Sequence, residues 1–583
     1  MLRARGLLVL MALVGLGCNP PENPSDGGVD GGDGPEVCVA FPERIDANYT
    51  VAKGCWLVLK TPTIATAVTI TVQPGAKLVF SEGTLLRISA EQVLTALGTA
   101  DAPILFTGSL PVRGHWKGLF FEGTSSPSTL EYLTVEYGGD TQADSSAAGI
   151  KLIADSRGVR VGFSHVTVRE SEGFGLWMTG SAVLPAFTAN VLTKNGLGPI
   201  SIDAATIGSI DSTTTYTGND KDEVQVRGTR VATTATWDAL GVPYHLTGDL
   251  QVREPGKLTL RPGVKLILPP EAALSVSGDA AALIANGTAQ APILLTGETQ
   301  TRGAWEGVVF DNSNNADNLL RYVTIEYSGN TSSDTKAAGV LATADSSGVQ
   351  VQFDHVVIRQ SQGYGLRASG SALFPTFASV TLTGNALGAA LIDSNAVHQL
   401  TLDSTYTGND VDRVFVEGRW VSNAVVWRAI DVPYAFVGVS LTPQKVWTLE
   451  AGVTLEMGPM TRIDVGGGDD VGFHAAGTAT KPVVITGIQK AKGSWDGIDY
   501  NGTLNAANVL DHCVIEYGGG GTRFGWQGMI NSHSDSHGVN VSVTNSTVRH
   551  SAVWGIYFNN NQTGSVSGNT YEDNTSGDYH RDP

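Results

Sequence analysis

The chain has 583 residues and a formal net charge of −19, with 42% hydrophobic and only 16% charged residues. The negative charge, without any basic patch, excludes a nucleic-acid partner because phosphate backbones would be repelled. Its 71 glycines, together with plentiful Thr, Val and Ser, favour strands and tight turns over helices.

Residues 1–18 have the pattern of an export signal. Arg3 and Arg5 precede an apolar run over residues 6–16, which is too short to span a membrane as a helix. The ending VGLGC resembles the lipobox of bacterial lipoproteins, although Gly15 stands where that family usually has Leu. The resemblance implies a lipid on Cys18, and an ordinary cleaved signal is the alternative. Asn19 implies, by resemblance to enteric sorting rules, the outer membrane or cell surface of a Gram-negative bacterium.

Residues 19–38 are rich in Pro, Gly and Asp and are expected to form a disordered tether, because they cannot bury a core. Cys38 and Cys55 stand at the start of the folded region, and in an exported protein we expect them to form a disulfide. Two free thiols are the alternative. Cys513 stands inside the strand phrase LDHCVIEY, so it is expected to be a strand residue.

One phrase occurs three times along the chain. It reads GTADAPILFTG at residues 98–108, GTAQAPILLTG at 287–297 and GTATKPVVITG at 477–487. The copies start 189 and 190 residues apart (287 − 98 and 477 − 287), which predicts a repeat architecture. We therefore divide the chain into segment 1 (39–229), segment 2 (230–419) and a shorter segment 3 (420–583), which together form one continuous solenoid.

The segments consist of short runs in which apolar residues alternate, separated by turns that contain Gly. This pattern predicts an all-β protein. Asn-Gly and Asp-Gly hairpin turns are few, while similar strand phrases such as LTVEY and VTVRE follow one another within a segment. Parallel stacking of successive coils is therefore favoured over a sandwich, with asparagines hydrogen-bonded in rows at the turns.

The repeated phrase, the W-x-G phrase after it and the following EYGG phrase resemble right-handed parallel β-helix proteins of bacterial surfaces. The resemblance covers residues 51–574. It implies an all-β, right-handed parallel β-helix with three internal repeats of about 190 residues. Pectate lyases and polygalacturonases share this fold, but the sequence lacks the NTD, GHG and R-x-P-x-x-R phrases of those enzymes. No catalytic residue is assigned.

Aligning the strand phrases pairs a glutamate with an arginine three times. The pairs are Glu136 with Arg169, Glu326 with Arg359, and Glu516 with Arg549. We interpret them as cross-strand ion pairs on the exposed outer face, worth up to about 1 kcal/mol each. A catalytic carboxylate is the alternative, but an active site is rarely needed three times.

The phrase GND-x-D places two carboxylates two residues apart, as Asp220 and Asp222 and again as Asp410 and Asp412. This is the best acidic pair for calcium, although a solvated turn is favoured. Segment 3 has only GNTYED at residues 568–573. Asp155, Asp345 and Asp535 stand in D-S-x-G phrases that suit turn capping. No metal site is assigned, and no cofactor other than calcium is expected.

Segment 3 also contains four histidines that the other segments lack: His512, His533, His537 and His550. They are candidate ligands of a polysaccharide site or of zinc, and zinc would require three or four of them to converge. Trp116, Trp305 and Trp495 share one repeated position. We expect them to pack in the core, with a sugar-stacking platform as the alternative.

These observations predict a non-enzymatic cell-envelope lipoprotein. Its membrane partner is reached through the lipid anchor, and its rod binds a polysaccharide or an envelope protein, in adhesion or envelope structure. A long regular flank suits extended polymers better than small molecules. The alternative is a polysaccharide lyase or glycoside hydrolase whose site lies in segment 3, where the sequence departs furthest from the shared plan.

Overall fold

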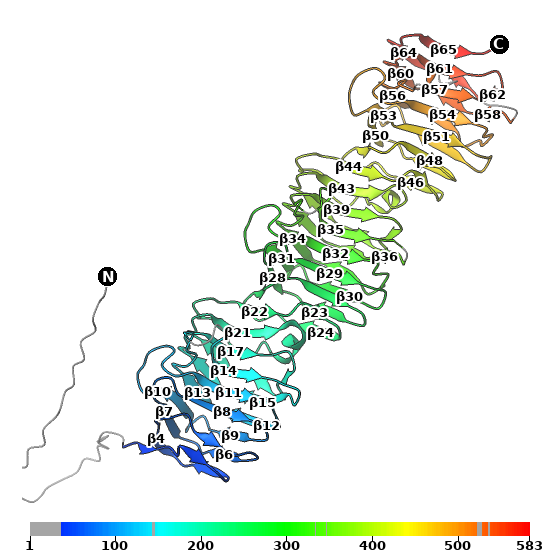
Figure 1. Cartoon of the computed structure of the whole chain (residues 1–583). Coiled ribbons are helices and arrows are strands. Elements are labelled where there is room, and N and C mark those ends of the chain that lie inside the picture. Colours follow the sequence, from blue (N-terminus) through cyan, green and yellow to red (C-terminus); the bar gives the residue numbers. More distant parts are fainter. Residues whose placement is uncertain (1–36, 143–145, 333, 346, 522–526, 534–536) are drawn as a thin grey trace, which may run out of the picture.

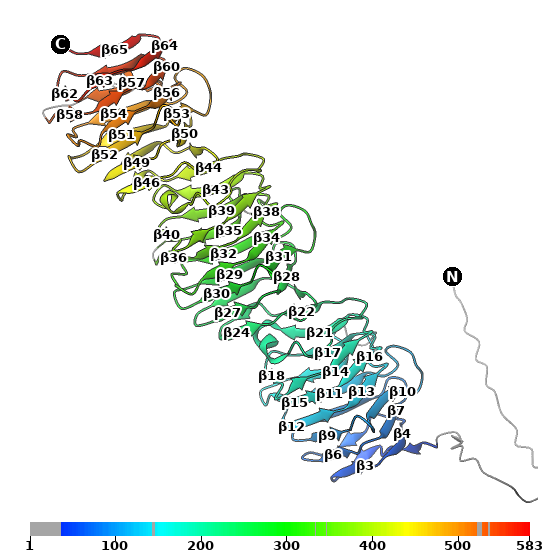
Figure 2. The same cartoon turned by 180° about the vertical axis from the view of Figure 1, so that it is seen from behind.

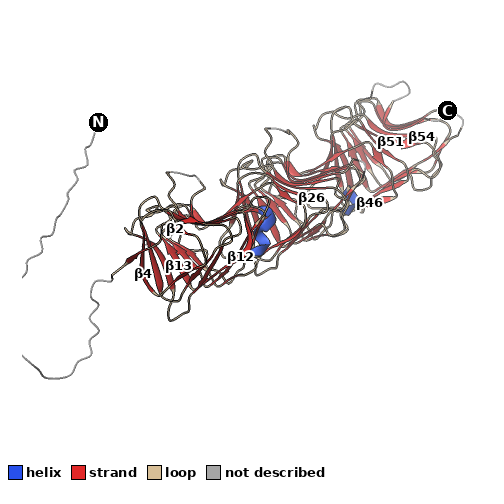
Figure 3. Cartoon of the chain, turned by 60° about the horizontal axis from the view of Figure 1, so that its bottom comes forward, coloured by secondary structure: helices blue, strands red, loops and turns tan. Residues whose placement is uncertain are grey.

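The computed structural model describes residues 37–142, 146–332, 334–345, 347–521, 527–533 and 537–583. Cys18, the residues before 37 and Asp535 lie outside this part of the chain. The described residues form one elongated rod, with β4 (Gly54–Val58) near one end and β65 (Gly577–Arg581) near the other (Figures 1 and 2). Figure 3 shows that almost all regular structure is strand.

Segment 1 is built from three sheets, and all of its strand pairings are parallel. Sheet 1 contains β1 (Val39–Ala40), β4, β7 (Ala76–Phe80), β10 (Ile104–Gly108), β13 (Leu133–Glu136), β16 (Thr167–Arg169) and β20 (Val191–Thr193). Sheet 2 begins with β8 (Leu85–Ser89), β11 (Gly118–Glu122), β14 (Ala148–Ile153), β17 (Phe174–Met178) and β21 (Gly198–Asp203). Sheet 3 contains β3 (Tyr49–Val51), β6 (Thr69–Val72), β9 (Val93–Leu97), β12 (Thr124–Glu131), β15 (Val159–Ser164) and β18 (Ala182–Val183), with β19 (Phe187–Thr188) also on β15.

Segment 2 continues sheet 2 and adds sheets 4 and 5. Sheet 2 goes on with β22 (Val224–Arg227), β25 (Tyr244–Leu246), β28 (Lys265–Leu268), β31 (Ile293–Gly297), β34 (Val323–Glu326), β38 (Val357–Arg359) and β42 (Thr381–Thr383). Sheet 4 begins with β23 (Arg230–Val231), β26 (Leu250–Arg253), β29 (Ala273–Ser277), β32 (Gly307–Asp311), β35 (Ala338–Thr343), β39 (Tyr364–Ser369) and β43 (Gly388–Asp393). Sheet 5 contains β24 (Thr234–Trp237), β27 (Lys257–Leu260), β30 (Ala282–Asn286), β33 (Leu319–Arg321), β37 (Gln352–Asp354) and β41 (Phe377–Ala378).

Segment 3 continues sheet 4 and adds sheets 6 and 7. Sheet 4 goes on with β44 (Val414–Glu417), β47 (Tyr434–Phe436), β50 (Thr454–Met457), β53 (Val483–Gly487), β56 (Cys513–Glu516), β60 (Thr547–Arg549) and β64 (Thr570–Glu572). Sheet 6 contains β45 (Trp420–Val421), β48 (Ser440–Pro443), β51 (Arg462–Gly466), β54 (Gly497–Asn501), β57 (Gly528–His533), β61 (Trp554–Phe558) and β65. Sheet 7 contains β46 (Val425–Trp427), β49 (Val446–Leu449), β52 (Gly472–Ala476), β55 (Val509–Asp511), β59 (Ser542–Thr544) and β63 (Val566–Ser567).

Three short strand pairs and two 3-10 helices complete the fold. The pairs are β2 (Arg44–Ile45) with β5 (Thr63–Ile64), β36 (Val349–Gln350) with β40 (Ala372–Leu373), and β58 (Val539–Asn540) with β62 (Gln562–Thr563). The helices are η1 (Ala204–Ser209) and η2 (Val397–Gln399). Neither they nor any other helix in the described part of the chain is long and apolar enough to cross a membrane. The predicted fold class, an all-β right-handed parallel β-helix, is confirmed.

The glycines of the repeated phrase allow successive coils to approach closely. In segment 2 a Cβ on Gly287 would lie 2.6 Å from the carbonyl oxygen of Tyr322 in the next coil, and one on Gly297 would lie 2.6 Å from Ala304 Cβ. Both separations are too short for a side chain, so these positions require glycine. Asparagines stack at the turns: Asn195 Nδ2 donates to Asn219 Oδ1 at 3.0 Å, and Asn385 Nδ2 donates to Asn409 Oδ1 at 2.9 Å.

Each new segment starts one face further around the rod. Here the faces of a segment are its three sheets, numbered in the order in which the chain crosses them. Strand β21 lies on the second face of segment 1, which is sheet 2. It pairs with β22, but β22 and the strands that follow it in sheet 2 form the first face of segment 2. The same hand-over joins β43 to β44. Matched residues of the three segments therefore lie in three different sheets. Glu136 is in sheet 1, Glu326 in sheet 2 and Glu516 in sheet 4, so one straight ligand along the rod cannot contact all three.

Candidate functional site

The outward row on the second face differs in residue type between the three segments. This face is sheet 2 in segment 1, sheet 4 in segment 2 and sheet 6 in segment 3. Strand alternation directs every second residue of such a strand outward; in β51, Ile463 and Val465 are buried while Asp464 is partly exposed. Residues paired directly across neighbouring strands make up each row. Segment 1 has Arg87, Phe120, Lys151, Trp177 and Ser201; segment 2 has Ser275, Val309, Leu341, Arg367 and Leu391; segment 3 has Asp464, Asp499, Asn531, Tyr557 and His580.

The segment 3 row begins in a shallow recess of about 190 Å³. It is lined by Thr442, Asp464, Val465, Gly466, Gly467, Asp499, Asn501 and His533. Asp499 is nearly buried, and its Oδ1 accepts hydrogen bonds from Asn531 Nδ2 at 2.8 Å and from His533 Nδ1 at 2.9 Å. These two donors fix the orientation of the Asp499 carboxylate.

The second carboxylate of the recess is held by a buried arginine. Arg462 Nε donates to both oxygens of Asp464 at 2.8 Å, and Arg462 Nη1 lies 3.8 Å from Asp496 Oδ2. Asp464 and Asp499 line the recess and Asp496 lies beside the same arginine, so three carboxylates outnumber Arg462. Among the residues that line the recess, His533 is the one further group that can carry a positive charge. The recess is therefore negative at neutral pH, so it favours neutral or cationic groups over anions.

Aromatic side chains continue the row beyond the recess. The rings of Tyr557 and His580 stack with centroids 4.9 Å apart, and Trp554 lies 5.1 Å from the same imidazole. Tyr557 Oη donates to Asp582 Oδ1 at 2.7 Å, and this hydrogen bond raises the pKa of Tyr557. All three rings are partly exposed. We call the recess and these rings together the segment 3 face.

The three predicted Glu–Arg pairs are present, but their carboxylates are not at an exposed site. Each pair lies directly across neighbouring strands with an N–O distance of 2.7 Å. The glutamates are only 7–8% exposed, because a threonine of the preceding coil covers each one. The hydroxyls of Thr107, Thr296 and Thr486 donate to Glu136, Glu326 and Glu516 at 3.0, 3.2 and 2.9 Å. These threonines are the next-to-last residues of the three copies of the repeated phrase. Their recurrence there is the sequence signal that could have revealed the contact.

The aspartates of the GND-x-D phrase do not act as pairs. Asp220 binds Arg113 at 2.7 Å and Asp410 binds Arg302 at 2.6 Å, contacts that span 107 and 108 residues. Asp222 accepts the backbone N–H of Asn219 at 2.7 Å, and Asp412 does the same for Asn409 at 2.8 Å. In segment 3, Lys492 takes the arginine position and binds Asp573 at 2.7 Å. The GNTYED phrase does not match the GND-x-D phrase, because it lies one coil earlier in its segment. It contains β64, which pairs with β60 as β20 pairs with β16, whereas GND-x-D follows one coil after β20.

The histidines of segment 3 do not converge. Each contacts a different carboxylate: His512 Nδ1 lies 2.8 Å from Asp511, His533 2.9 Å from Asp499, and His537 Nε2 3.0 Å from Asp469. His550 pairs with Asp573 at 3.2 Å. The described residues contain no group of three or more His, Cys, Asp or Glu that could hold a metal ion. His533 is the one of these histidines that lines the recess.

The repeated tryptophans lie in the core and form no platform for sugars. Trp116, Trp305 and Trp495 have no exposed surface. The indole N–H of each donates at 2.9 Å to the backbone carbonyl of the ion-paired glutamate in its own segment. At the turns, Asp155 accepts a hydrogen bond from the Arg157 side chain at 2.7 Å and another from its backbone N–H at 2.8 Å. Both hold the pKa of Asp155 below its usual value, the side-chain bond more than the backbone bond. Cys513 is a buried strand residue, as expected.

An unpredicted charge cluster lies at the junction of segments 1 and 2. His245 on β25 contacts Glu223 through Nδ1 at 2.9 Å and Glu298 through Nε2 at 2.6 Å. The hydrogen bond with Glu223, and then that with Glu298, raises the pKa of His245 against the opposing effect of burial. The second junction lacks this cluster, because Ala435 occupies the matched position.

The His245 cluster predicts a pH-dependent first junction. A raised folded-state pKa means that protonation stabilises the fold below the unfolded pKa of about 6.5 and that this is lost as pH rises through the folded pKa. We expect hydrogen exchange in β25 to show about 1 kcal/mol more protection at pH 6 than at pH 9. His245→Gln should remove that difference and leave β47 unchanged. Equal pH dependence in the variant would contradict the assignment.

Comparison with known families agrees with the fold. Residues 229–317 match the family model of the pectate-lyase-like beta helix domain. No curated protein matches the chain. The matched stretch covers the beginning of segment 2 and ends before the segment 3 face. The similarity therefore supports the β-helix architecture and assigns no chemistry to that face.

Proposed function

We propose that the chain is a lipid-anchored cell-envelope protein whose rod binds an extended glycan, without cleaving it, along the segment 3 face. The observation that carries the proposal is the continuous row from Asp464 to His580. It joins the carboxylates of Asp464 and Asp499, beside the His533 imidazole, to partly exposed rings on consecutive coils, with the buried Asn531 between them. Carboxylates and amides hydrogen-bond sugar hydroxyls, and aromatic rings offer an apolar surface beside a polar edge.

The charge of the recess narrows the class of glycan. Three aspartates outnumber one arginine, so polyuronates and sulfated polymers would be repelled. Neutral glycans and polymers of amino sugars suit the recess better. The flat, open form of the face also suits an extended polymer, because the recess is below the usual range of about 300–1,000 Å³ for enclosed small-molecule pockets.

The proposal also includes a lipid anchor on Cys18 and the cellular location of the protein. Lipidation of Cys18 would fix the chain to the membrane, and residues 19–38 would act as a tether between the anchor and the first coil. The export pattern and the Cys38–Cys55 disulfide support an extracytoplasmic location, since disulfides persist in oxidising compartments. The outer membrane of a Gram-negative bacterium is the proposed site.

A polysaccharide-cleaving enzyme is the second candidate. Asp464 and Asp499 are directly paired on neighbouring strands, at the strand spacing of about 4.8 Å. Two carboxylates at about 5 Å are the arrangement that retaining glycosidases use. Binding without cleavage is favoured because Arg462 engages both oxygens of Asp464, so neither oxygen is free to attack a sugar.

The test is retention on immobilised neutral, amino-sugar and acidic polysaccharides, with parallel assays for reducing ends and unsaturated uronates. We expect retention without products, strongest on neutral or amino-sugar polymers. Asp499→Asn should weaken retention about ten-fold, because it removes a charge-assisted hydrogen-bond acceptor. Val309→Ala changes the matched position of segment 2 and serves as the control. Equal retention by both variants would reject the segment 3 face, and products lost in Asp499→Asn would establish the enzyme instead.

A further inference from the structure

A recess of about 560 Å³ lies at the junction of segments 1 and 2, away from the segment 3 face. Its walls are β18 with the adjoining Leu184, helix η1, and β24. The second junction has a matched recess of about 350 Å³ beside η2, lined by Ala372 and Gln399 among others. The two junctions therefore provide an internal comparison of the same site.

At the second junction the side-chain amide of Gln399 occupies the hydrogen-bonding edge of β40. Leu373 faces β36, since its carbonyl accepts the N–H of Val351, the residue directly after that strand, at 3.0 Å. Successive residues of a strand direct their backbone N–H and C=O groups to opposite sides. The backbone groups of Ala372 and Phe374 therefore point toward the recess. Gln399 Oε1 accepts the Phe374 N–H at 2.6 Å, and Gln399 Nε2 donates to the Ala372 carbonyl at 3.0 Å. The side-chain amide thus binds this edge as the peptide group of an added strand would.

At the first junction the same edge is left open. Ala182 and Leu184 match Ala372 and Phe374, but Ser209 stands where the second junction has Gln399. The Ser209 hydroxyl is too short to reach the edge and donates to the Thr206 carbonyl at 2.7 Å. In the part of the chain that the structure describes, no side chain hydrogen-bonds the Leu184 N–H or the Ala182 carbonyl.

The opposite wall of the first recess also presents backbone. Lys257 N–H donates to the Thr233 carbonyl at 3.3 Å, and Arg261 N–H donates to the Trp237 carbonyl at 3.1 Å. Residues 233, 235 and 237 therefore face β27, so the backbone groups of Thr234 and Thr236 point away from it, toward the recess. An extended polypeptide has hydrogen-bonding groups on both of its edges, which suits a recess with strand edges on two sides. A glycan's acetamido group has a single amide and suits it less well.

We propose that the recess at the first junction binds an extended peptide segment of a partner protein as an added β-strand on the edge of β18. Its main-chain carbonyl accepts the Leu184 N–H and its N–H donates to the Ala182 carbonyl. Its contacts repeat those that Gln399 makes at the second junction.

The test uses the full chain and a fluorescent peptide of alternating threonine and valine. We expect the peptide to bind and to slow hydrogen exchange at the Leu184 amide, which should exchange faster than the Phe374 amide in its absence. Ser209→Gln should close the edge, slow exchange at Leu184 without peptide and weaken peptide binding about ten-fold, because two hydrogen bonds are then made internally. Ser209→Ala is the matched control and should bind like the unchanged chain.

A reciprocal variant, which should gain a binding site, distinguishes a closed edge from a folding defect in Ser209→Gln. Gln399→Ser should open the second junction and allow a second peptide to bind, with new protection at Phe374. Protection of Leu184 in the absence of peptide would overturn the proposal, as would undiminished binding by Ser209→Gln or no binding at all. Protection of Leu184 by chitin oligosaccharides, with none from the peptide, would also overturn the peptide assignment.

Discussion

Trp305→Ala is expected to lower the free energy of unfolding of its coils by about 4 kcal/mol, the usual cost of emptying a buried tryptophan site. Trp305 has no exposed surface, and its indole N–H donates to the Glu326 carbonyl at 2.9 Å. The substitution therefore leaves a cavity and an acceptor without its donor. Native-state hydrogen exchange of β32 and β34 measures the effect, because each coil of a solenoid contacts only its neighbours.

Trp420→Ala is the matched control for this prediction. Trp420 is 42% exposed and lies under the guanidinium of Arg419 on the rod surface. Its removal should change local stability by less than about 1 kcal/mol, since no cavity forms. Equal losses in the two variants would show that Trp305 is not a core anchor.

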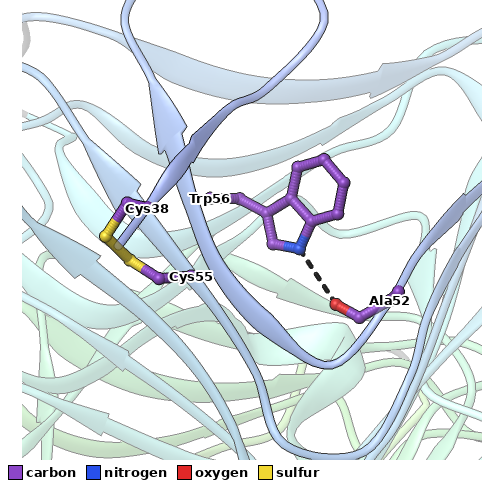
Figure 4. Close-up of a disulfide and its surroundings, with 4 residues drawn as sticks. All are labelled: Cys38, Ala52, Cys55 and Trp56. Atoms are coloured by element: carbon purple, nitrogen blue, oxygen red, sulfur yellow. Dashed lines mark hydrogen bonds between the residues drawn. A yellow bond between two sulfur atoms is a disulfide. The ribbon is translucent and has the colours of Figure 1, made fainter. Parts of the chain in front are cut away.

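Removing the Cys38–Cys55 disulfide is expected to cost the first coil about 3 kcal/mol. The bond closes a loop with a sequence separation of 17 and ties the start of β1 to β4 (Figure 4). A cross-link of this length stabilises mainly by restricting the unfolded chain. Next to it, Trp56 Nε1 donates to the Ala52 carbonyl at 2.9 Å, so the same coil also orders an aromatic ring.

Reducing agent and a double variant test the disulfide separately. Reduction should speed proteolysis and hydrogen exchange in β1 and β4 and leave β28 unchanged. The Cys38→Ala, Cys55→Ala variant should behave like the reduced chain and no longer respond to reductant. Cys513 should not interfere by thiol exchange, because burial raises its pKa to about 12 and only thiolates exchange. An unchanged first coil after reduction would contradict the prediction.

The sequence by itself determined the fold class and the coil-to-coil pairing of matched strands. Alternating apolar residues set which side of each strand is buried, and alignment of the recurring phrases places Glu326 opposite Arg359, as in the structure. Both features repeat at a fixed interval, so they can be read from local patterns. The packing of Trp305 followed from the same repetition.

Only the tertiary structure decided which groups meet across several coils and which face they occupy. Arg113 reaches Asp220 over 107 residues, Thr296 covers Glu326, and His245 lies between two glutamates. Ser209, where the second junction has Gln399, leaves the edge of β18 open. The hand-over of sheets at the first junction places β25, which carries His245, in sheet 2. It depends on how many faces the chain crosses before a segment restarts. Strand alternation has the same period on every face, so no local pattern records that number.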